Sequence, residues 1–310
     1  MKVFPHNFNP KSNSGPNKFT RQLFKNVIDN FSIEIVSDQK SADIEFCLIQ
    51  QVAEKIKPTV LRLDGIYFNS SQDYEQQNDP IKNTYNNANA VIFQSEFNRK
   101  LTEHWFGPHK NFKVIHNAPD DTLISKITSS QFDKKIDPNI EVWSCASSWR
   151  PHKRLQENIR YFIEKSSDEA ILIIAGGGAS NIDLYDHADI LGKRIFYLGE
   201  VAYGTLLSLF KRSSTFLHLA YLDHCPNVVV DAQACGCHIV CSSTGGTSEI
   251  VKRGTIVIED KWGYEPIELY NPPSMNFDSY IELSLKDDHI TMKDCARMYY
   301  EVFMGVYDER

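Results

Sequence analysis

The chain has 310 residues, more than a small single domain needs and enough for two domains of ordinary size. Its formal net charge of -7 argues against nucleic acid as a principal partner, because no basic excess is available to neutralise phosphates. No apolar run approaches the roughly twenty residues that cross a bilayer, and the opening stretch MKVFPHNFNP lacks a signal-peptide core. We therefore expect a cytoplasmic protein, and peripheral contact with a membrane surface stays open.

Strand-like and helix-like segments alternate through the first half of the chain. Helices are predicted from Phe19 to Ile28, within 70–87, and from the N-cap Ser95 to Trp105. Strands are predicted at 1–6, 32–37, 43–50, 59–65, 88–95 and 112–120. Between about 118 and 138 the pattern dissolves into polar residues, which predicts a connection between domains.

The alternation then starts again. Strands are predicted at 140–146, 170–177, 194–199, 215–221, 238–243 and 255–259. Helices are predicted at 152–165, 203–212, 226–236, from 247, at 278–286 and at 292–307. Such alternation indicates an α/β fold with mostly parallel sheets covered by helices.

Seven cysteines without a secretory signal are expected to be reduced thiols. A zinc site is an alternative for Cys235, Cys237 and Cys241. Their spacing is not that of a standard zinc finger, and Cys241 falls in an apolar strand, so we expect small core residues instead.

The run from Tyr221 to Val251 carries the clearest chemistry. Asp223 lies in a predicted strand-to-helix loop, and Asp231 lies eight positions later in the helix. Behind them, Gly245 and Gly246 precede a short helix, where exposed N–H groups suit a phosphate. Carboxylates that can bind hydroxyls, followed by an anion site, point to a phosphorylated sugar compound.

This stretch resembles the donor-site signature of the GT-B glycosyltransferases. The similar family is the large retaining family four, also called glycosyl transferases group 1, which includes sucrose-phosphate and lipopolysaccharide glycosyltransferases. Its signature has two acids separated by seven positions, then A-x-A-C-G, an apolar strand and G-G-x-x-E. This chain has DAQACG, HIVCSS and GGTSEI in that order, with Asp at both acidic positions where the family more often has Glu.

The resemblance implies two Rossmann-like domains that face a cleft. Residues 1–120 would form the acceptor-side domain, 121–138 the linker and 139–288 the donor domain. The C-terminal helix, from about 289, would cross back onto the first domain.

The resemblance also assigns roles in the donor domain. Lys153 matches a lysine that meets the donor diphosphate, and Arg150 lies close enough to share that task. Asp231 matches the acid that binds ribose hydroxyls, and Asp223 the acid near the sugar hydroxyls. The amides around Cys225 to Val228, including those of Asn227 and Val228, are expected to assist Asp223.

Further positions complete the expected site. Gly245, Gly246 and Thr247 would form the anion site, and Glu249 would either cap its helix, orient a neighbour or contact the ligand. In the first half, the loop around Gly15 resembles a glycine-bearing loop that reaches the donor.

Asp64 would line the reaction centre or orient the acceptor, although a simple turn-forming D-G pair remains an alternative. Asn117 and Asp120 match a motif at the domain exit and are expected to fix the hinge. The glycines of AGGGA at 175–179 do not make a dinucleotide-binding motif and are expected to form a turn after a strand.

The resemblance implies a retaining hexosyltransferase that moves a sugar from a UDP- or GDP-linked donor to a glycan, lipid or small-molecule acceptor. No cofactor and no metal are expected. Two alternatives stay open: a nucleotide-sugar-binding protein that has lost catalysis, and a GT-B nucleotide-sugar epimerase.

Overall fold

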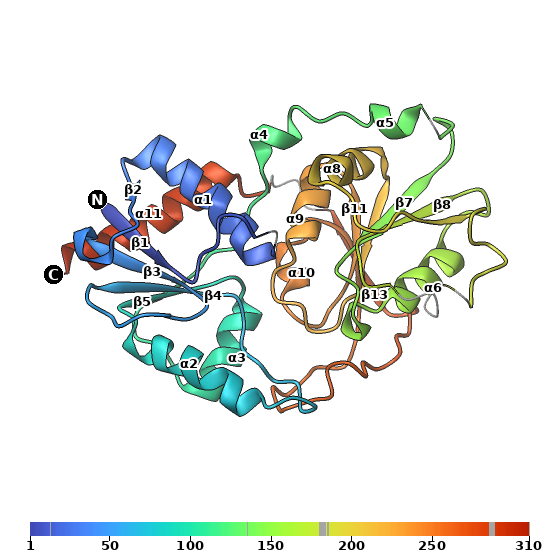
Figure 1. Ribbon diagram of the computed structural model, residues 1–310. Coiled ribbons are helices and arrows are strands. Elements are labelled where there is room, and N and C mark those ends of the chain that lie inside the picture. The colour runs from blue at the N-terminus through green and yellow to red at the C-terminus, as the bar shows by residue number, and fades with distance from the viewer. Residues whose placement is uncertain (13, 135, 180–183, 185, 285–288, 310) are drawn as a thin grey trace. The chain divides into compact units, whose positions relative to one another are not determined.

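The computed structural model describes residues 1–310 except 13, 135, 180–183, 185, 285–288 and 310. The chain forms two compact units, each built on its own sheet (Figure 1). The first unit comprises Met1–Asp120, Gly263–Ile267 and Ile290–Arg310, and the second comprises Asp121–Trp262 and Glu268–His289. No helix in the described part of the chain combines the length and the apolarity needed to cross a membrane.

The first unit has a six-stranded sheet in the order β2-β1-β3-β4-β5-β6, with every pair parallel. The strands are β1 (Lys2–His6), β2 (Glu34–Ile35), β3 (Ile44–Leu48), β4 (Thr59–Leu63), β5 (Ala90–Phe93) and β6 (Phe112–Val114). The helices are α1 (Gly15–Phe31), the 3-10 turn η1 (Gln39–Ser41), α2 (Tyr74–Asn87), α3 (Glu96–Phe106) and α11 (Met292–Asp308). Strands β3, β4 and β5 are buried along their whole length, as a parallel sheet covered on both faces requires.

The C-terminal helix α11 belongs to the first unit and packs beside α1 (Figure 1). Phe19 of α1 meets Tyr299 of α11 in the shared core, and Phe31 stacks on Tyr300 at a ring distance of 5.1 Å. The return of this helix to the first unit, expected from the resemblance, is therefore present.

A short excursion of the chain, Gly263–Ile267, also packs in the first unit. Ile267 pairs with Asn69 in an isolated bridge, and Trp105 donates its indole N–H to the Tyr264 carbonyl at 2.8 Å. The resemblance instead places these residues in the donor domain. Their attachment depends on bonds to residues about 160 and 200 positions away, which no local pattern reveals.

The second unit has a seven-stranded sheet in the order β13-β12-β11-β10-β7-β8-β9. The strands are β7 (Val142–Ala146), β8 (Ile171–Ala175), β9 (Ile195–Tyr197), β10 (Thr215–His218), β11 (His238–Ser242), β12 (Arg253–Val257) and β13 (Tyr280–Ser284). The helices are α4 (Asp121–Ile124), α5 (Ser130–Asp133), η2 (Pro151–Lys153), α6 (Leu155–Lys165), α8 (Tyr203–Arg212), α9 (Asn227–Ala234) and α10 (Thr247–Ile250). All pairs are parallel except β12 with β13.

The helix predicted at 278–286 is wrong for its described part. Residues Tyr280–Ser284 form the edge strand β13, which pairs antiparallel with β12. Tyr280 and Ile281 are about half exposed, so this segment has no apolar face that a helix could bury. The backbone hydrogen bonds to β12 therefore determine that Tyr280–Ser284 forms a strand.

The segment 121–138, expected to be a linker, lies in the second unit and carries α4 and α5. It is fastened to α8, because Ser208 Oγ donates to the Thr128 carbonyl at 2.6 Å and Arg212 donates to the Asp137 carbonyl at 3.0 Å. Ile124 is also buried in the core of this unit, and Ile127 and Phe132 pack against that core.

All seven cysteines are free thiols. Cys237 and Cys241 are buried in the core of the second unit, as predicted, and Cys237 Sγ donates to the Phe210 carbonyl at 3.1 Å.

Candidate functional site

The candidate site lies where the strand order of the second unit reverses. From β7 the chain adds β8 and β9 on one side, then returns to add β10, β11 and β12 on the other. In open α/β sheets, ligands bind outside the carboxyl ends of the strands at such a reversal. Lys153 follows β7 and Asp223 follows β10, so both residues come from the loops at this point.

Lys153 and Asp223 are in direct contact. Lys153 Nζ lies 2.5 Å from Asp223 Oδ2, and His218 Nε2 lies 2.9 Å from the same oxygen. The backbone N–H of His224 donates to the other oxygen, Oδ1, at 3.0 Å. One carboxylate therefore receives a cation, an imidazole and an amide.

The charge state of this cluster follows from its surroundings. Burial alone would raise the pKa of Asp223, but the Lys153 ammonium and the bond from His218 hold that pKa well below its usual range. Burial lowers the pKa of His218, against the pull of Asp223. His218 is thus neutral near pH 7, and because an ionised carboxylate only accepts, the imidazole proton resides on Nε2.

Backbone geometry fixes the loop that holds Asp223. Leu222 adopts a left-handed conformation with φ 56°, and the Gly246 N–H donates to the Asp223 carbonyl at 2.7 Å. Gly245 has φ 80°, and a Cβ there would lie 2.4 Å from the Asp223 carbonyl oxygen. Only glycine fits at that position, so the two glycines serve to seat the Asp223 loop.

This contact engages one of the amides of the anion site expected behind the glycines. The Gly246 amide is occupied by Asp223, and α10 has only four residues, so its dipole is short. Thr247 is buried, and its hydroxyl has no partner among the described residues. Glu249 is half-buried, and its own N–H approaches the Gly246 carbonyl at 3.3 Å.

Asp231 lies in α9, the helix that directly follows the Asp223 loop. Its side chain is buried, and Tyr203, the first residue of α8, donates its hydroxyl to Asp231 Oδ2 at 3.0 Å. Asn227 and Val228 open α9, directly after Pro226. The N–H groups of Val229 and Val230 donate to the Pro226 carbonyl at 3.0 and 3.3 Å. No acid occupies this first turn, so the positive end of the α9 dipole suits an anion.

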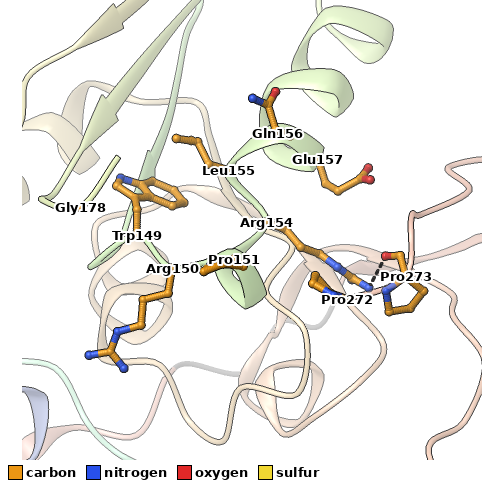
Figure 2. Close-up of a pocket in the computed structure, with 10 residues that line it drawn as sticks. All are labelled: Trp149, Arg150, Pro151, Arg154, Leu155, Gln156, Glu157, Gly178, Pro272 and Pro273. Atoms are coloured by element: carbon orange, nitrogen blue, oxygen red, sulfur yellow. Dashed lines mark hydrogen bonds between the residues drawn. The ribbon is translucent and has the colours of Figure 1, made fainter. Parts of the chain in front are cut away.

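The basic loop after β7 contains three cations with different surroundings. Arg150 is exposed, and Figure 2 shows it extending away from Arg154. It lines a cavity of about 500 Å³ together with Trp149, Pro151, Arg154, Leu155, Gln156, Glu157, Gly178, Pro272 and Pro273. Arg150 is not among the residues that contact Asp223, so the structure brings only Lys153 of the predicted pair to the carboxylate.

Arg154 is a buried cation next to Lys153 that no sequence motif indicated. It adopts φ 50° between η2 and α6, and its buried guanidinium binds both oxygens of Glu259 at 3.0 and 2.8 Å. It also donates to the Pro273 carbonyl at 2.8 Å, drawn as a dashed line in Figure 2, and lies over the Tyr221 ring. Arg154 therefore ties together the loops that frame Lys153.

The glycines after β8 form the turn predicted for them. Gly176 has φ 102°, and a Cβ there would collide with the Ser147 carbonyl. The segment therefore packs against the loop that follows β7.

Two predicted residues belong to the first unit. Gly15 is the first residue of α1. Asp64 follows β4 and forms an ion pair with buried Arg62, which also binds Asn117 at 3.0 Å and Tyr299 at 3.1 Å. Burial raises the pKa of Asp64, although the Arg62 charge opposes it. Asn117 thus fixes a buried arginine at the carboxyl end of the sheet.

Comparison with known proteins places the fold. Residues 127–264 match the family model described as glycosyl transferases group 1. A sequence comparison with curated proteins gives no match.

Three solved structures are similar over nearly their whole length. Sucrose-phosphate synthase from Thermosynechococcus elongatus has a TM-score of 0.67 at 10% identity, covering 100% of this chain and 97% of that one. Anabaena Alr3699/HepE, in complex with UDP and glucose, has a TM-score of 0.62 at 15% identity, with 100% and 98% covered. WaaG, a glycosyltransferase involved in lipopolysaccharide biosynthesis, has a TM-score of 0.63 at 9% identity, with 99% and 93% covered.

The chain therefore has the GT-B fold, and its residues 127–264 match the family model of glycosyl transferases group 1.

Proposed function

We propose that this protein is a glycosyltransferase that moves a sugar from a nucleotide-sugar donor, bound by the second unit, to an acceptor. The observation that carries the proposal is the Lys153 ammonium, held 2.5 Å from ionised Asp223 at the reversal point of the sheet. This is a fixed positive charge in the place where an open α/β sheet binds its ligand.

The charge suits the chemistry of a leaving nucleoside diphosphate. As the bond to the sugar breaks, negative charge gathers on the diphosphate, and a preorganised cation stabilises it without rearrangement. The amides at the start of α9 add partial positive charge on the adjacent loop. Lys153, with Arg150 as an outer cation, would do this without a metal ion.

The nucleoside would be held through Asp231. Its buried carboxylate, on the fifth residue of α9, can accept hydrogen bonds from ribose hydroxyls. Tyr203 already donates to Oδ2, which fixes the carboxylate in one orientation. UDP and GDP are the candidate nucleotides, and the complexes of HepE with UDP and UDP-glucose favour UDP for the first test.

Retention of the anomeric configuration is part of the proposal. It rests on the resemblance of the donor-site signature, in which the phosphate oxygen of the donor helps to take the acceptor proton and no protein nucleophile attacks. The product anomer, read from proton NMR coupling constants, tests this feature.

The first experiment is a thermal-shift screen with UDP, GDP, ADP, CDP and dTDP. A ligand that binds only the folded state raises the melting temperature by mass action, so one diphosphate should stabilise the protein above the others. Transfer from the matching nucleotide sugars is then assayed with and without acceptor. Nucleotide binding without transfer would favour a binding protein, and conversion of the sugar without acceptor would favour an epimerase.

A further inference from the structure

His218 is a buried, neutral histidine that no part of the proposed reaction uses. It is the last residue of β10, its side chain is 4% exposed, and its Nε2–H points at Asp223 Oδ2. The burial of a polar ring at the carboxyl end of a central strand calls for a partner, and Asp223 is that partner.

The Asp223 carboxylate is itself turned inward. Oδ2 receives Lys153 and His218, Oδ1 receives the His224 amide, and the side chain is only 15% exposed. A carboxylate that accepts three protein hydrogen bonds has little capacity left for a sugar hydroxyl. Asp is also one methylene shorter than Glu, which keeps this carboxylate near β10.

The bond to Asp223 holds the flexible Lys153 side chain in one position. A lysine ammonium is a point charge on a flexible stem, and fixing that stem costs conformational entropy. Among the described residues, Asp223 is the acceptor that lies within bonding distance of the ammonium, which has three N–H groups. Two N–H groups therefore remain for a ligand.

We propose that His218 and Asp223 are positioning residues that hold the Lys153 ammonium for the diphosphate of the donor, and that Asp223 acts through Lys153 and not on the sugar. This inference rests on the proposed function of the site. His218 orients Asp223, Asp223 orients Lys153, and Lys153 meets the phosphates.

A pair of neutral amides tests the first link. In His218→Gln the side-chain nitrogen can replace imidazole Nε2 and still donate to Asp223. In His218→Asn the nitrogen takes the place of Nδ1, so the bond to Asp223 is lost. We expect His218→Asn to weaken UDP binding about tenfold in titration calorimetry, the scale of a lost hydrogen bond to a charged group. His218→Gln should bind UDP within about threefold of wild type.

A double-mutant cycle tests whether His218 acts through Lys153. In a Lys153→Met background, His218→Asn should weaken UDP binding no further, because the cation that it positions is absent. An equal loss in both backgrounds would show that His218 acts independently and would overturn the proposal. So would unchanged binding in His218→Asn.

Controls separate this outcome from general damage. His238 is the first residue of β11 and bonds to Thr255 at 2.8 Å. His238→Leu therefore removes a histidine from the amino ends of the strands, opposite the carboxyl ends where His218 lies. It should bind UDP as wild type does. If His218→Asn does not fold, as judged by circular dichroism, His218→Leu replaces it in the same cycle.

The test also distinguishes this inference from the proposed function. If the wild-type protein binds neither UDP nor GDP, the proposed donor site is wrong. Both the proposed function and the positioning roles of His218 and Asp223 would then be overturned. Wild-type binding that His218 and Asp223 substitutions leave unchanged would overturn only the positioning roles.

Discussion

Lys153 and Asp223 are 70 positions apart in the sequence, yet their side chains meet at 2.5 Å at the reversal point of the second sheet. Neither side chain is exposed: Lys153 is 18% accessible and Asp223 is 15% accessible. A substitution at Lys153 should therefore affect the stability of the fold as well as the reaction. Loss of the ammonium leaves the Asp223 carboxylate without its counter-ion.

Lys153→Met should therefore affect both catalysis and stability. We expect transfer to fall at least about a hundredfold, the scale for one lost transition-state contact. Urea denaturation should show a loss of about 1–3 kcal/mol, the scale for a charged group that loses its partner.

Adding Asp223→Asn separates these two effects. The double variant no longer carries a buried charge, so stability should recover while transfer stays low. Near-normal transfer by folded Lys153→Met protein would remove Lys153 from the reaction.

The Asp231 carboxylate should accept hydrogen bonds from the ribose hydroxyls of the nucleotide. Asp231→Asn keeps the shape and removes the charge, so it should weaken binding of the nucleoside diphosphate by about 1.5–3 kcal/mol. A 2′,3′-dideoxy nucleotide should bind wild type and variant equally in titration calorimetry. If the variant still prefers the ribose form as strongly as wild type does, Asp231 does not contact the ribose. Tyr203→Phe, which removes only the hydroxyl that orients Asp231, should have a smaller effect in the same direction.

Two partly buried histidines should make the fold sensitive to acid. Burial and the neighbouring Lys153 charge lower the pKa of His152 to about 3, and burial lowers the pKa of His224 to about 4. Below about pH 6.5 these two histidines bind protons in the unfolded chain but not in the folded chain. The free energy of unfolding therefore falls as the pH drops toward 4. Each histidine contributes at most about 1.4 kcal/mol per pH unit, and above pH 6.5 neither contributes.

Urea denaturation at several pH values measures this dependence. His152 stacks on Tyr270 with 24° between the rings, so His152→Phe keeps the packing and removes the titration. The variant should lose one histidine's share of the slope between about pH 6.5 and 4. An unchanged slope would mean that His152 is protonated in the folded protein.

Transfer should persist in excess EDTA, because the charge proposed to stabilise the leaving group is a side chain of the protein and cannot be chelated. High salt should raise the donor KM, since it screens the exposed Arg150 more than the half-buried Lys153. Replacing Arg150 by Gln should remove most of that salt dependence. Activity that EDTA abolishes and Mn²⁺ restores would contradict a metal-independent reaction.

The sequence predicts most elements whose signals are local. Buried parallel strands such as β4 and β8 appear as short apolar runs, and Ser95 caps α3 by accepting from the Asn98 N–H at 3.1 Å. The edge strand β13 could not be found this way, because its half-exposed side chains give no burial pattern and its ladder partner is distant in sequence.

The candidate site was predicted in part for the same reason. The signature predicted Asp223 in a strand-to-helix loop, Asp231 in the helix that follows and Lys153 near the donor diphosphate, and the parallel topology brings Lys153 to Asp223. It could not show that Asp223 is satisfied by His218. Nor could it show which of Arg150, Lys153 and Arg154 is buried. The burial of Arg154 depends on its left-handed backbone and on its ion pair with Glu259, 105 positions later.

The central claim is that the protein breaks the bond between a sugar and a nucleoside diphosphate and passes that sugar to an acceptor. The most direct measurement uses a nucleotide sugar labelled in the sugar, with the diphosphate found by the thermal-shift screen, and follows both products by chromatography. We predict one nucleoside diphosphate released for each labelled sugar recovered in the acceptor, with loss of both in Lys153→Met. Tight diphosphate binding with no label in any glycan, lipid or small-molecule acceptor would contradict the assignment as a transferase.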